Sequence, residues 1–292
     1  MQIRDYINTL SERMDAADLA FAHGTATALD DAVYLVYCTL DISFSVAIDE
    51  LTDELDDAAF ETLEVLARRR IEKRVPVAYL VGKAWFAGHQ FYCDSSALIP
   101  RSPIAELIAN SFQPMLASTP ARILDLCTGS GCIGIACALA FREANVTLSD
   151  ISGACVELAG RNVDLHDLGH LVEVVESDLF EVVDGSFDLI VSNPPYVSEE
   201  EVAALPAEFR HEPELGLLSD DQGLAIPLQI LRSAPDYLTE TGLLVMEVGF
   251  SAAALQHRLA GVPLLWLEFE EGGEGVFALS RKQLIQYRDL LN

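Results

Sequence analysis

The sequence has no apolar run long enough to cross a membrane, because no block of about 20 apolar residues is uninterrupted. The nearest candidate, residues 123–141, contains Asp125 and a Thr-Gly-Ser-Gly turn, so it predicts a strand, a loop and a helix instead. The opening segment, MQIRDYINTLSERMD, lacks the apolar region of a signal peptide. None of the six cysteines forms a CxxC pair, which predicts reduced, mostly buried thiols. We therefore expect a cytoplasmic protein without a metal site or a membrane contact.

Basic residues are scarce, with 18 Lys and Arg against 46 Asp and Glu, and the net charge is −28. Residues 101–292 alone hold 29 acids and 10 bases, a net charge of −19. Such a field repels phosphate backbones and favours basic partners. An acidic surface equally serves solubility or life in a salty cytoplasm. The charge therefore argues against a nucleic-acid substrate, but it does not identify a partner.

Residues 1 to about 72 show apolar residues at helical spacing and no clear strand alternation. One face of the first helix would carry Ile3, Tyr6, Ile7, Leu10 and Met14. Residues 84–99, AWFAGHQFYCDSSALI, predict a hairpin, because apolar and aromatic residues flank Gly88-His89. With 292 residues, 51% of them hydrophobic, the chain is long enough for two cores. We expect a helical domain over residues 1–83, a hairpin connector over 84–100 and a larger domain over 101–292.

The only basic cluster in the sequence precedes Pro76 and contains Arg68, Arg69, Arg70, Lys73 and Arg74. Cations near the C-terminal end of a helix interact favourably with the helix dipole. The alternative is a nucleic-acid-binding patch. We favour the first explanation, because these cations lie in the last turns of the expected helix, just before the proline.

From about residue 100 the pattern changes to strands that alternate with helices. Repeated β–α units predict an α/β fold with a doubly wound, mostly parallel sheet and helices on both of its faces. The stretch LLWLEFEEGGEGVFAL instead predicts a C-terminal antiparallel hairpin, which brings the sheet to seven strands. The expected parallel strands are Arg122–Leu126, Val146–Asp150, Val172–Val175, Phe187–Val191 and Leu243–Val248.

A glycine-rich loop follows the first of these strands, in RILDLCTGSGCIGIACALAF. Gly129, Gly131 and Gly134 satisfy G-x-G-x-x-G, which permits a tight turn and lets a ligand approach the backbone at a helix N-terminus. The second strand ends at Asp150, where an acid would reach a pair of ribose hydroxyls. A dinucleotide-binding oxidoreductase would show the same pattern, so this loop alone does not decide the function.

Asp125 lies inside the first expected strand, ahead of the glycines. A negative charge there opposes a pyrophosphate but suits a cofactor with a cationic head. The segment resembles motif I, D-x-x-x-G-x-G, of class I S-adenosylmethionine-dependent methyltransferases. The resemblance implies S-adenosyl-L-methionine as cofactor and S-adenosyl-L-homocysteine as product, with no metal. The cofactor site that it implies consists of Asp125, Thr128, Gly129, Gly131, Asp150, Asp178 and Asn193.

The resemblance also assigns roles within this site. Gly129 and Gly131 would border the methionine portion of the cofactor, and Asp150 would hold the ribose hydroxyls. Asp178, in VVESDLF after the third strand, would lie beside the adenine. Structural alternatives remain for both acids, because Asp150 can cap its strand end and Asp178 can cap a helix N-terminus.

The fourth strand ends in LIVSNPPYVS at residues 189–198, and its last residues should face the cofactor's methyl group. A planar amide or amine nitrogen is a poor nucleophile, so acceptors on its N–H groups would orient it and stabilise developing positive charge. Asn193 offers its side-chain oxygen and Pro194 its carbonyl, which Pro194 and Pro195 hold in place by fixing φ. Tyr196 would pack against the planar group and near the sulfonium. A plain strand followed by a turn is the alternative.

The [N/D]-P-P-[Y/F/W] motif occurs in methyltransferases of nucleic-acid base amines and in those of protein glutamine amides. The acidic charge favours glutamine, since a base methyltransferase should present a cationic face. The segments RVPVAYLVGKAWFAGHQFYCDSSALIPRSP and EFRHEPELGLLSDDQGL resemble protein N(5)-glutamine methyltransferases, from about Val75 to the C-terminus. We expect a monomer whose N-terminal helical domain recognises the substrate.

Within this family, KAWFAGHQFYCD, PRSPI, RHEPELGL and WLEFEEGGEGVF resemble the branch that acts on the large-subunit ribosomal protein L-three. The release-factor branch typically reads P-R-P-x-T-E after the hairpin, whereas Glu106 is displaced here by one position. The resemblance implies methylation of a glutamine amide in a basic ribosomal protein. The alternatives are release factors, an adenine-amine methyltransferase, a dinucleotide-binding oxidoreductase and a non-catalytic binding module.

Several residues near these motifs keep two interpretations. His89 and His211 are either general bases or surface residues. Glu212 and Glu214 either attract a basic substrate loop or are merely solvated. Arg101 is either a buried structural cation or a contact of the cofactor carboxylate. Trp85 and Trp266 are expected in the core.

Overall fold

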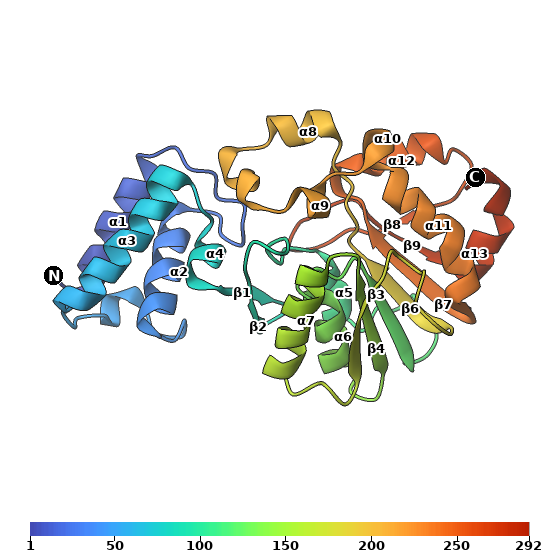
Figure 1. The fold of residues 1–292 in the computed structure, drawn as a ribbon, viewed down its shortest axis with the longest axis horizontal. Coiled ribbons are helices and arrows are strands. Elements are labelled where there is room, and N and C mark those ends of the chain that lie inside the picture. Colours follow the sequence, from blue (N-terminus) through green and yellow to red (C-terminus); the bar gives the residue numbers. More distant parts are fainter. Residues whose placement is uncertain (292) are drawn as a thin grey trace.

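The computed structural model describes residues 1–291 and consists of a helical N-terminal part and a larger α/β part (Figure 1). In the helical part, α2 begins where the Thr27 side chain accepts the Asp30 backbone N–H, and α3 begins where Asp56 accepts that of Ala59. The apolar faces of these helices meet in one buried cluster. The helices of this part are α1 (Ile3–Asp15), α2 (Ala28–Leu40), η1 (Ile48–Glu50), α3 (Asp57–Lys73) and α4 (Val77–Val81).

A hairpin of β1 (Lys83–Phe86) and β2 (His89–Tyr92) follows and pairs antiparallel, as expected. Its strands end at Tyr92, and residues 93–100 continue as a loop toward the α/β part. Trp85 is 38% exposed, so its expected place in the core is wrong. It packs edge-on against Tyr34 and Phe44 instead.

The strands of the α/β part form a seven-stranded sheet in the order β5-β4-β3-β6-β7-β9-β8. Strands β5, β4, β3, β6 and β7 run parallel, and β9 is antiparallel to both β7 and β8, which confirms the predicted fold class. The strand bounds are β3 (Arg122–Leu126), β4 (Asn145–Asp150), β5 (Val172–Glu176), β6 (Phe187–Ser192), β7 (Leu238–Glu247), β8 (Leu265–Trp266) and β9 (Val276–Ser280).

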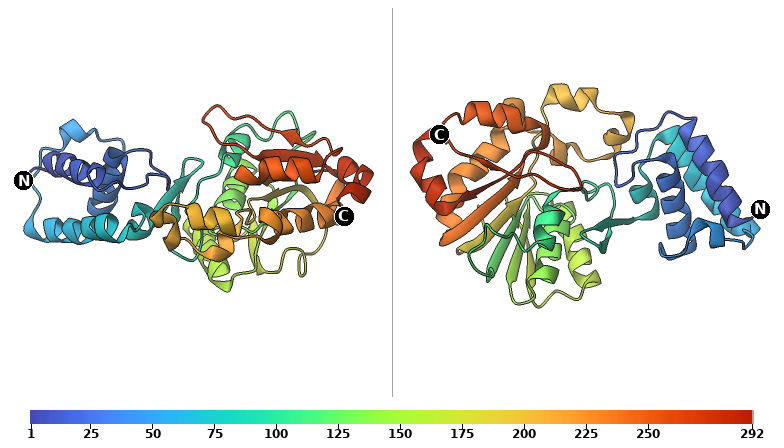
Figure 2. Two further views of the ribbon diagram at one scale, coloured as in Figure 1. Left: turned by 90° about the horizontal axis from the view of Figure 1, so that it is seen from above. Right: turned by 180° about the vertical axis from the view of Figure 1, so that it is seen from behind.

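Alternate residues of the central strands point to opposite faces of the sheet, so each face has its own apolar layer. In β6, Leu189 and Val191 join the layer beneath α5, α6 and α7, whereas Ile190 joins the layer beneath α11, α12 and α13. The helices lie on both faces of the sheet (Figure 2). Their bounds are α5 (Ile104–Ala109), α6 (Cys132–Ala140), α7 (Gly153–Leu165), α11 (Ala225–Tyr237), α12 (Ala252–Arg258) and α13 (Arg281–Gln286).

Residues 197–218, which we call the strap, leave the α/β part after β6 and reach across to the helical part (Figure 1). The strap contains α8 (Glu199–Ala204), η2 (Ala207–His211) and α9 (Glu214–Leu217). It returns to α10 (Asp220–Gly223) ahead of α11, and the remaining short turns are η3 (Gly249–Ser251) and η4 (Arg288–Leu290). Within residues 1–291, the helices are too short or too polar to cross a membrane.

Candidate active site

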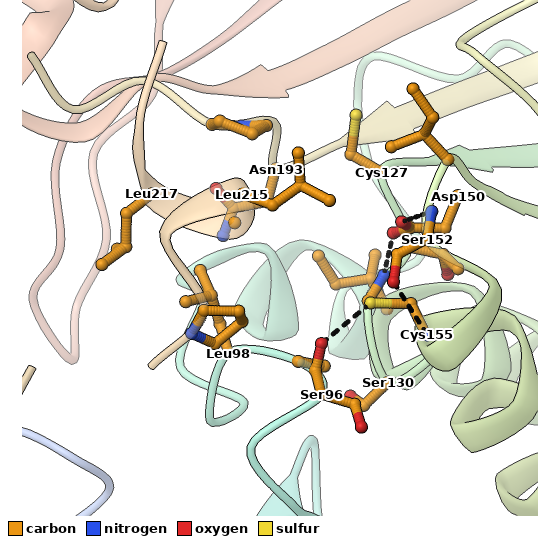
Figure 3. A pocket seen from close by; sticks show the side chains of 18 of the residues that line it. Ser96, Leu98, Cys127, Ser130, Asp150, Ser152, Cys155, Asn193, Leu215 and Leu217 are labelled. Carbon is orange, nitrogen blue, oxygen red and sulfur yellow. Dashed lines mark hydrogen bonds between the residues drawn. The ribbon is translucent and has the colours of Figure 1, made fainter. Parts of the chain in front are cut away.

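A cavity opens at the carboxyl ends of β3, β4 and β6 and is covered by residues of the strap and of the loop before α5 (Figure 3). Ligands bind at this edge of open α/β sheets, because the loops that leave parallel strands converge there. The sequence-predicted residues that line the cavity are Thr128, Gly129, Asp150, Asp178, Asn193, Pro195 and Tyr196. Gly131, Asp125 and Pro194 lie outside its wall.

The loop after β3 turns sharply through backbone conformations that favour glycine, with φ of +56° at Gly129 and +81° at Gly131. Helix α6 then begins at Cys132, with its N-terminus behind the loop. A Cβ on Gly134 would lie 2.1 Å from the Leu148 side chain, so glycine is required where α6 packs on β4. The three glycines therefore serve the turn and the helix packing, and the turn leaves backbone facing the cavity.

Asp125 organises this loop from beneath. It is buried in β3, and its Oδ2 accepts from Thr128 Oγ1 at 2.6 Å and from the Gly134 backbone N–H at 2.8 Å. Burial, which outweighs these two hydrogen bonds, raises the pKa of Asp125 to about 7. Its Oδ1 has no hydrogen-bond partner within the described residues. Asp125 therefore shapes the loop that faces the cavity.

Asp150 caps its strand end, as one interpretation expected, and also lies in the cavity wall, where the other interpretation requires it. Its Oδ1 accepts from the Ser152 backbone N–H at 2.9 Å, which caps the strand end. Its Oδ2 accepts from the Gly129 backbone N–H at 2.8 Å, and the residue lines the cavity. Burial raises the pKa of Asp150. Asp178 also lines the cavity, and it opens a turn, so its alternative role as a helix cap is not found.

The end of β6 carries the NPPY segment to the opposite wall. Ser192 Oγ donates to the Leu126 carbonyl at 2.8 Å, which ties the last residue of β6 to β3. Asn193 then points toward the cavity in Figure 3, and among residues 1–291 nothing hydrogen-bonds to its side chain. Pro194 is buried behind it, while Pro195 and Tyr196 line the wall. An unpartnered amide is thus presented to whatever occupies the cavity.

At the edge of the cavity, the half-buried Arg101 pairs with the buried carboxylate of Glu212. The two guanidinium nitrogens Nη1 and Nη2 each lie 2.6 Å from a Glu212 carboxylate oxygen, and the Ile99 backbone N–H donates to Oε1. Burial opposes ionisation of Glu212, but the His23 ring and the Arg101 guanidinium outweigh it and lower its pKa to about 2. Arg101 is therefore a structural cation that also lines the cavity, and Glu212 is not merely solvated.

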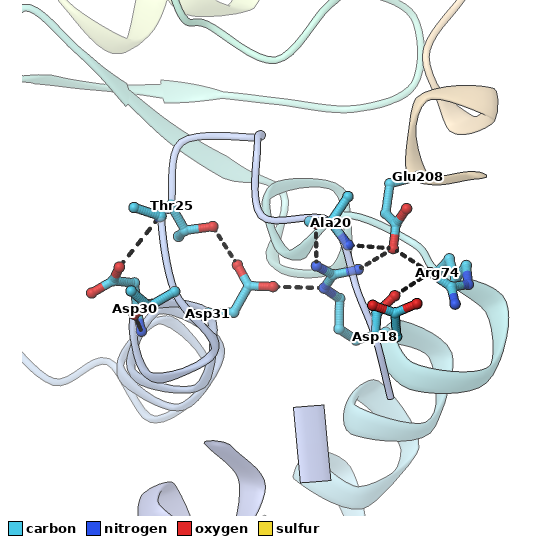
Figure 4. Close-up of polar contacts among 10 residues, drawn as sticks. Asp18, Ala20, Thr25, Asp30, Asp31, Arg74 and Glu208 are labelled. Carbon is cyan, nitrogen blue, oxygen red and sulfur yellow. Dashed lines mark hydrogen bonds and ion pairs between the residues drawn. The ribbon is translucent and has the colours of Figure 1, made fainter. Parts of the chain in front are cut away.

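A second buried acid of the strap, Glu208, joins it to the helical part (Figure 4). Its Oε1 accepts from the Ala20 backbone N–H at 3.1 Å and from Arg74 Nη1 at 3.0 Å. Arg70 is 2% exposed, lies 3.5 Å from Glu208 and donates to Asp31 at 2.6 Å. Two cations of the basic cluster are therefore committed to ion pairs, which weakens the nucleic-acid alternative.

The two histidines near the motifs lie outside the cavity wall. His211 Nε2 lies 2.8 Å from the Lys73 carbonyl, on the strap side of the helical part. The His89 ring, on the hairpin, lies 5.9 Å from the His166 ring. Neither position supports the general-base interpretation. Within residues 1–291 no three His, Cys, Asp or Glu side chains are grouped so that they could hold a metal ion.

Sequence reasoning missed Glu247, at the end of β7. Its carboxylate accepts a hydrogen bond from the Tyr196 hydroxyl at 3.2 Å and one from Ser102 Oγ at 2.5 Å. The sequence feature that could have identified Glu247 is a single acid at the end of an otherwise apolar strand, in LLVMEVG. A buried acid in such a strand needs a hydrogen-bond partner, and this strand ends at the same sheet edge as the NPPY segment.

The fold and the cavity define a class I S-adenosylmethionine-dependent methyltransferase. Crystal structures of the hMettl16 catalytic domain in complex with MAT2A 3'UTR hairpins share the fold. One has a TM-score of 0.52 at 13% identity, covering 95% of this chain and 90% of that chain. The other has a TM-score of 0.50 at 16% identity, covering 77% and 81%. The family model "Methyltransferase small domain" matches residues 105–210.

Two relatives narrow this class. A "Ribosomal protein uL3 glutamine methyltransferase" of Francisella tularensis is 41% identical over 290 residues, covering 98% of this chain and 92% of that protein. One of the same name from Xylella fastidiosa is 45% identical over 289 residues, with the same coverage. The chain belongs to the family of ribosomal protein uL3 glutamine methyltransferases.

Proposed function

We propose that the protein transfers a methyl group from S-adenosyl-L-methionine to the side-chain amide nitrogen of a glutamine in ribosomal protein uL3. The observation that carries the proposal is the Asn193 side chain, which lines the cavity without a partner among the described residues, across from Gly129 and Asp150. The names of the two relatives support uL3 over release factors as the substrate.

The donor set of the cavity fits this cofactor. Gly129 presents backbone rather than a side chain, and a Cβ there would have Ala97 as its nearest neighbour at 3.6 Å. The Asp150 carboxylate keeps lone pairs beyond its two backbone hydrogen bonds, so it can accept from a hydroxyl pair. Asp178 can accept from an exocyclic amine. When bound, S-adenosyl-L-methionine supplies an electrophilic methyl group and leaves as S-adenosyl-L-homocysteine.

The residues of this chain orient the acceptor. The Asn193 side-chain oxygen accepts one N–H of the glutamine amide. The Pro194 carbonyl, next in the chain although Pro194 is not part of the cavity wall, is proposed to accept the other, so that the nitrogen faces the methyl group. Both acceptors stabilise the positive charge that develops on nitrogen. The Tyr196 ring bounds the same space. No strong base is needed, because the methylated nitrogen is acidic and loses its proton to water.

The helical part is proposed to recognise the ribosomal protein, with a domain boundary near residue 83 and the hairpin as connector. The strap supports a role of the helical part at the site, because its buried carboxylates Glu208 and Glu212 pair with cations of the helical part and of the cavity edge. The net charge of −28 suits a basic protein substrate. We propose that the protein works as a monomer in the cytoplasm, on a protein rather than on nucleic acid.

The test is transfer of labelled methyl from S-adenosyl-L-methionine to purified uL3, with a release factor and ribosomal RNA as competing acceptors. We expect label in uL3 alone, at a glutamine. The Asn193→Ala variant should lose about 100- to 1,000-fold in kcat, because a charge-stabilising contact is removed, with little change in cofactor Kd. Asn145→Ala, at an exposed position on β4, is the matched control.

Equal loss of cofactor binding and of turnover in Asn193→Ala would contradict the role of Asn193. Label in the release factor would show that the substrate is a release factor rather than uL3. Label in RNA, together with a steep loss of RNA binding in salt, would establish the base-methyltransferase alternative.

A further inference from the structure

Tyr196 is held from several sides by residues that are distant in sequence. Its hydroxyl donates to Glu247 Oε1 at 3.2 Å, and Ser251 Oγ donates to its carbonyl oxygen at 2.6 Å. Gly249 lies against the ring, where a Cβ would be 2.7 Å from Cε2. Gly223 lies against the backbone, where a Cβ would be 2.1 Å from the same carbonyl oxygen. The ring and backbone of Tyr196 are therefore restricted to one orientation.

Glu247 is the only one of these neighbours whose side chain hydrogen-bonds the hydroxyl of Tyr196 within the described residues. It ends β7 after a run of buried apolar residues, 243–246, and is itself 5% exposed. Burial raises the pKa of Glu247 to about 7. A carboxyl group at such a place costs folding free energy unless it is hydrogen-bonded, so its presence calls for a reason beyond packing.

The second oxygen of Glu247 links Tyr196 to the loop that covers the cavity. Oε2 accepts from Ser102 Oγ at 2.5 Å, and Ser102 Oγ in turn accepts from the Ile104 backbone N–H at 3.2 Å, at the start of α5. Ser102 lines the cavity, whereas Glu247 does not. Glu247 therefore touches the two walls of the cavity without reaching its interior.

We infer that Glu247 is a positioning residue for methyl transfer, which holds the Tyr196 ring beside Asn193 by accepting the tyrosine hydroxyl. Its effect on turnover rests on the proposed function, whereas its effect on the ring does not. Because the hydroxyl is committed to Glu247, the ring face of Tyr196 is the part that meets the glutamine amide. A displaced ring would leave the amide free to rotate away from the methyl group.

The test compares Glu247→Ala with Glu247→Gln, whose side-chain oxygen still accepts from Tyr196 and whose nitrogen can donate to Ser102. We expect Glu247→Ala to lower kcat by about 10- to 100-fold, with cofactor Kd and the KM for uL3 within about threefold. Glu247→Gln should restore kcat to within about threefold of wild type. Glu240→Ala, at an exposed position on the same strand, is the matched control and should leave kcat unchanged.

A double variant separates positioning from general stability. If Glu247 acts through Tyr196, Glu247→Ala combined with Tyr196→Phe should lose no more kcat than the worse single variant. Losses that multiply would overturn the inference, as would a Glu247→Gln variant as impaired as Glu247→Ala.

The position of the ring gives a readout that needs no activity. A crystal structure of Glu247→Ala should show the Tyr196 ring rotated or in more than one conformation, whereas Glu247→Gln should keep it in place. An unmoved, well-ordered ring in Glu247→Ala would overturn the inference. If wild-type protein does not label uL3, the proposed function fails, and the ring position still decides the role of Glu247.

Discussion

Asp125 shows how burial at a single residue couples folding to pH. In the folded protein its pKa is raised to about 7, chiefly by burial, against hydrogen bonds from Thr128 and Gly134 that lower it. In the unfolded chain the carboxyl titrates near its ordinary value of about 4. Between these two values the folded state binds the proton that the unfolded state has lost.

The sign of the pH dependence follows from this difference. The stabilising contribution of protonated Asp125 is complete below pH of about 4 and is lost as pH rises through about 7. We therefore expect the free energy of unfolding of wild type to fall relative to that of Asp125→Asn as pH rises from 4 to about 7, and then to level off. Urea unfolding of both proteins across this range measures it. Because Glu247 titrates in both, its contribution cancels in the comparison. A constant difference would contradict the raised pKa.

Most of the site residues predicted from the sequence do line the cavity, because local pattern places them there. Asp150 ends β4, and Gly129 and Asn193 follow β3 and β6. Parallel strands end at one edge of the sheet, so these residues meet there. Glu247 could not be predicted in this way, because its partner Tyr196 lies 51 residues away and the contact depends on how β7 packs beside β6. The sequence predicts Asp125 as a cofactor contact, whereas in the structure Asp125 supports the glycine-rich loop from beneath. A position within a strand predicts which face of the sheet a side chain takes, but not which segments cover that face.

At the scale of elements, the strap connects the two parts of the molecule. Glu208 is fully buried and accepts from Ala20 and Arg74, with Arg70 at 3.5 Å. Glu212, four positions later, pairs with Arg101 at the cavity. Helix α9, which covers the cavity, follows directly. Two buried carboxylates of the strap therefore connect it to the helical part and to the edge of the cavity.

We expect Glu208→Gln to lower the free energy of unfolding by about 3 kcal/mol, because it leaves buried Arg70 charge without one of its partners. This loss of stability is at the low end of the range for breaking a buried ion pair, because Asp31 still pairs with Arg70. Chemical denaturation measures the change, and limited proteolysis should cut within the strap sooner than in wild type. Glu200→Gln, at an exposed position on the same strap, should change stability by less than about 0.5 kcal/mol. Equal stability of the two variants would show that the buried pair does not hold the strap.

The strands of the sheet were predictable as elements, and the strap was not. Apolar runs in β3 and β6 are dense enough to mark a buried strand, and β3 was predicted at its observed bounds. The first residues of β7 escaped prediction because Thr239, Glu240 and Thr241 are polar and partly or fully exposed, although Leu238 pairs with Phe187. The strap helices α8 and α9 are short, and tertiary ion pairs rather than periodicity hold them in place.

At the scale of the whole molecule, few cations remain free to offset the acidic surface. Arg13, Arg70, Arg74 and Arg101 are each engaged with a carboxylate of the same chain. The acids that remain unpaired set the field outside the protein. A field of this sign attracts a basic protein over distances of about a Debye length, which is about 10 Å at 0.1 M salt.

We expect the kcat/KM for intact uL3 to fall by about tenfold or more as sodium chloride rises from about 0.05 to 0.3 M, because screening removes the attraction that speeds encounter. For a short, uncharged peptide that carries the same glutamine, kcat/KM should change by less than about twofold. The peptide carries no positive charge that the enzyme's net charge of −28 could attract. Initial rates of methyl transfer to both acceptors, at substrate concentrations well below KM, measure the two responses in one protein preparation.

The free energy of unfolding, measured over the same salt range, separates association from folding. If the acidic surface serves encounter with a basic partner, the salt effect appears in kcat/KM for uL3 and is small in kcat, because steering ends once the complex has formed. If the surface is instead an adaptation to a salty cytoplasm, stability and kcat for both acceptors rise together with salt, since screening relieves repulsion among the acids. A fall in kcat/KM of equal size for protein and peptide would contradict steering, because the peptide lacks the charge that steering requires.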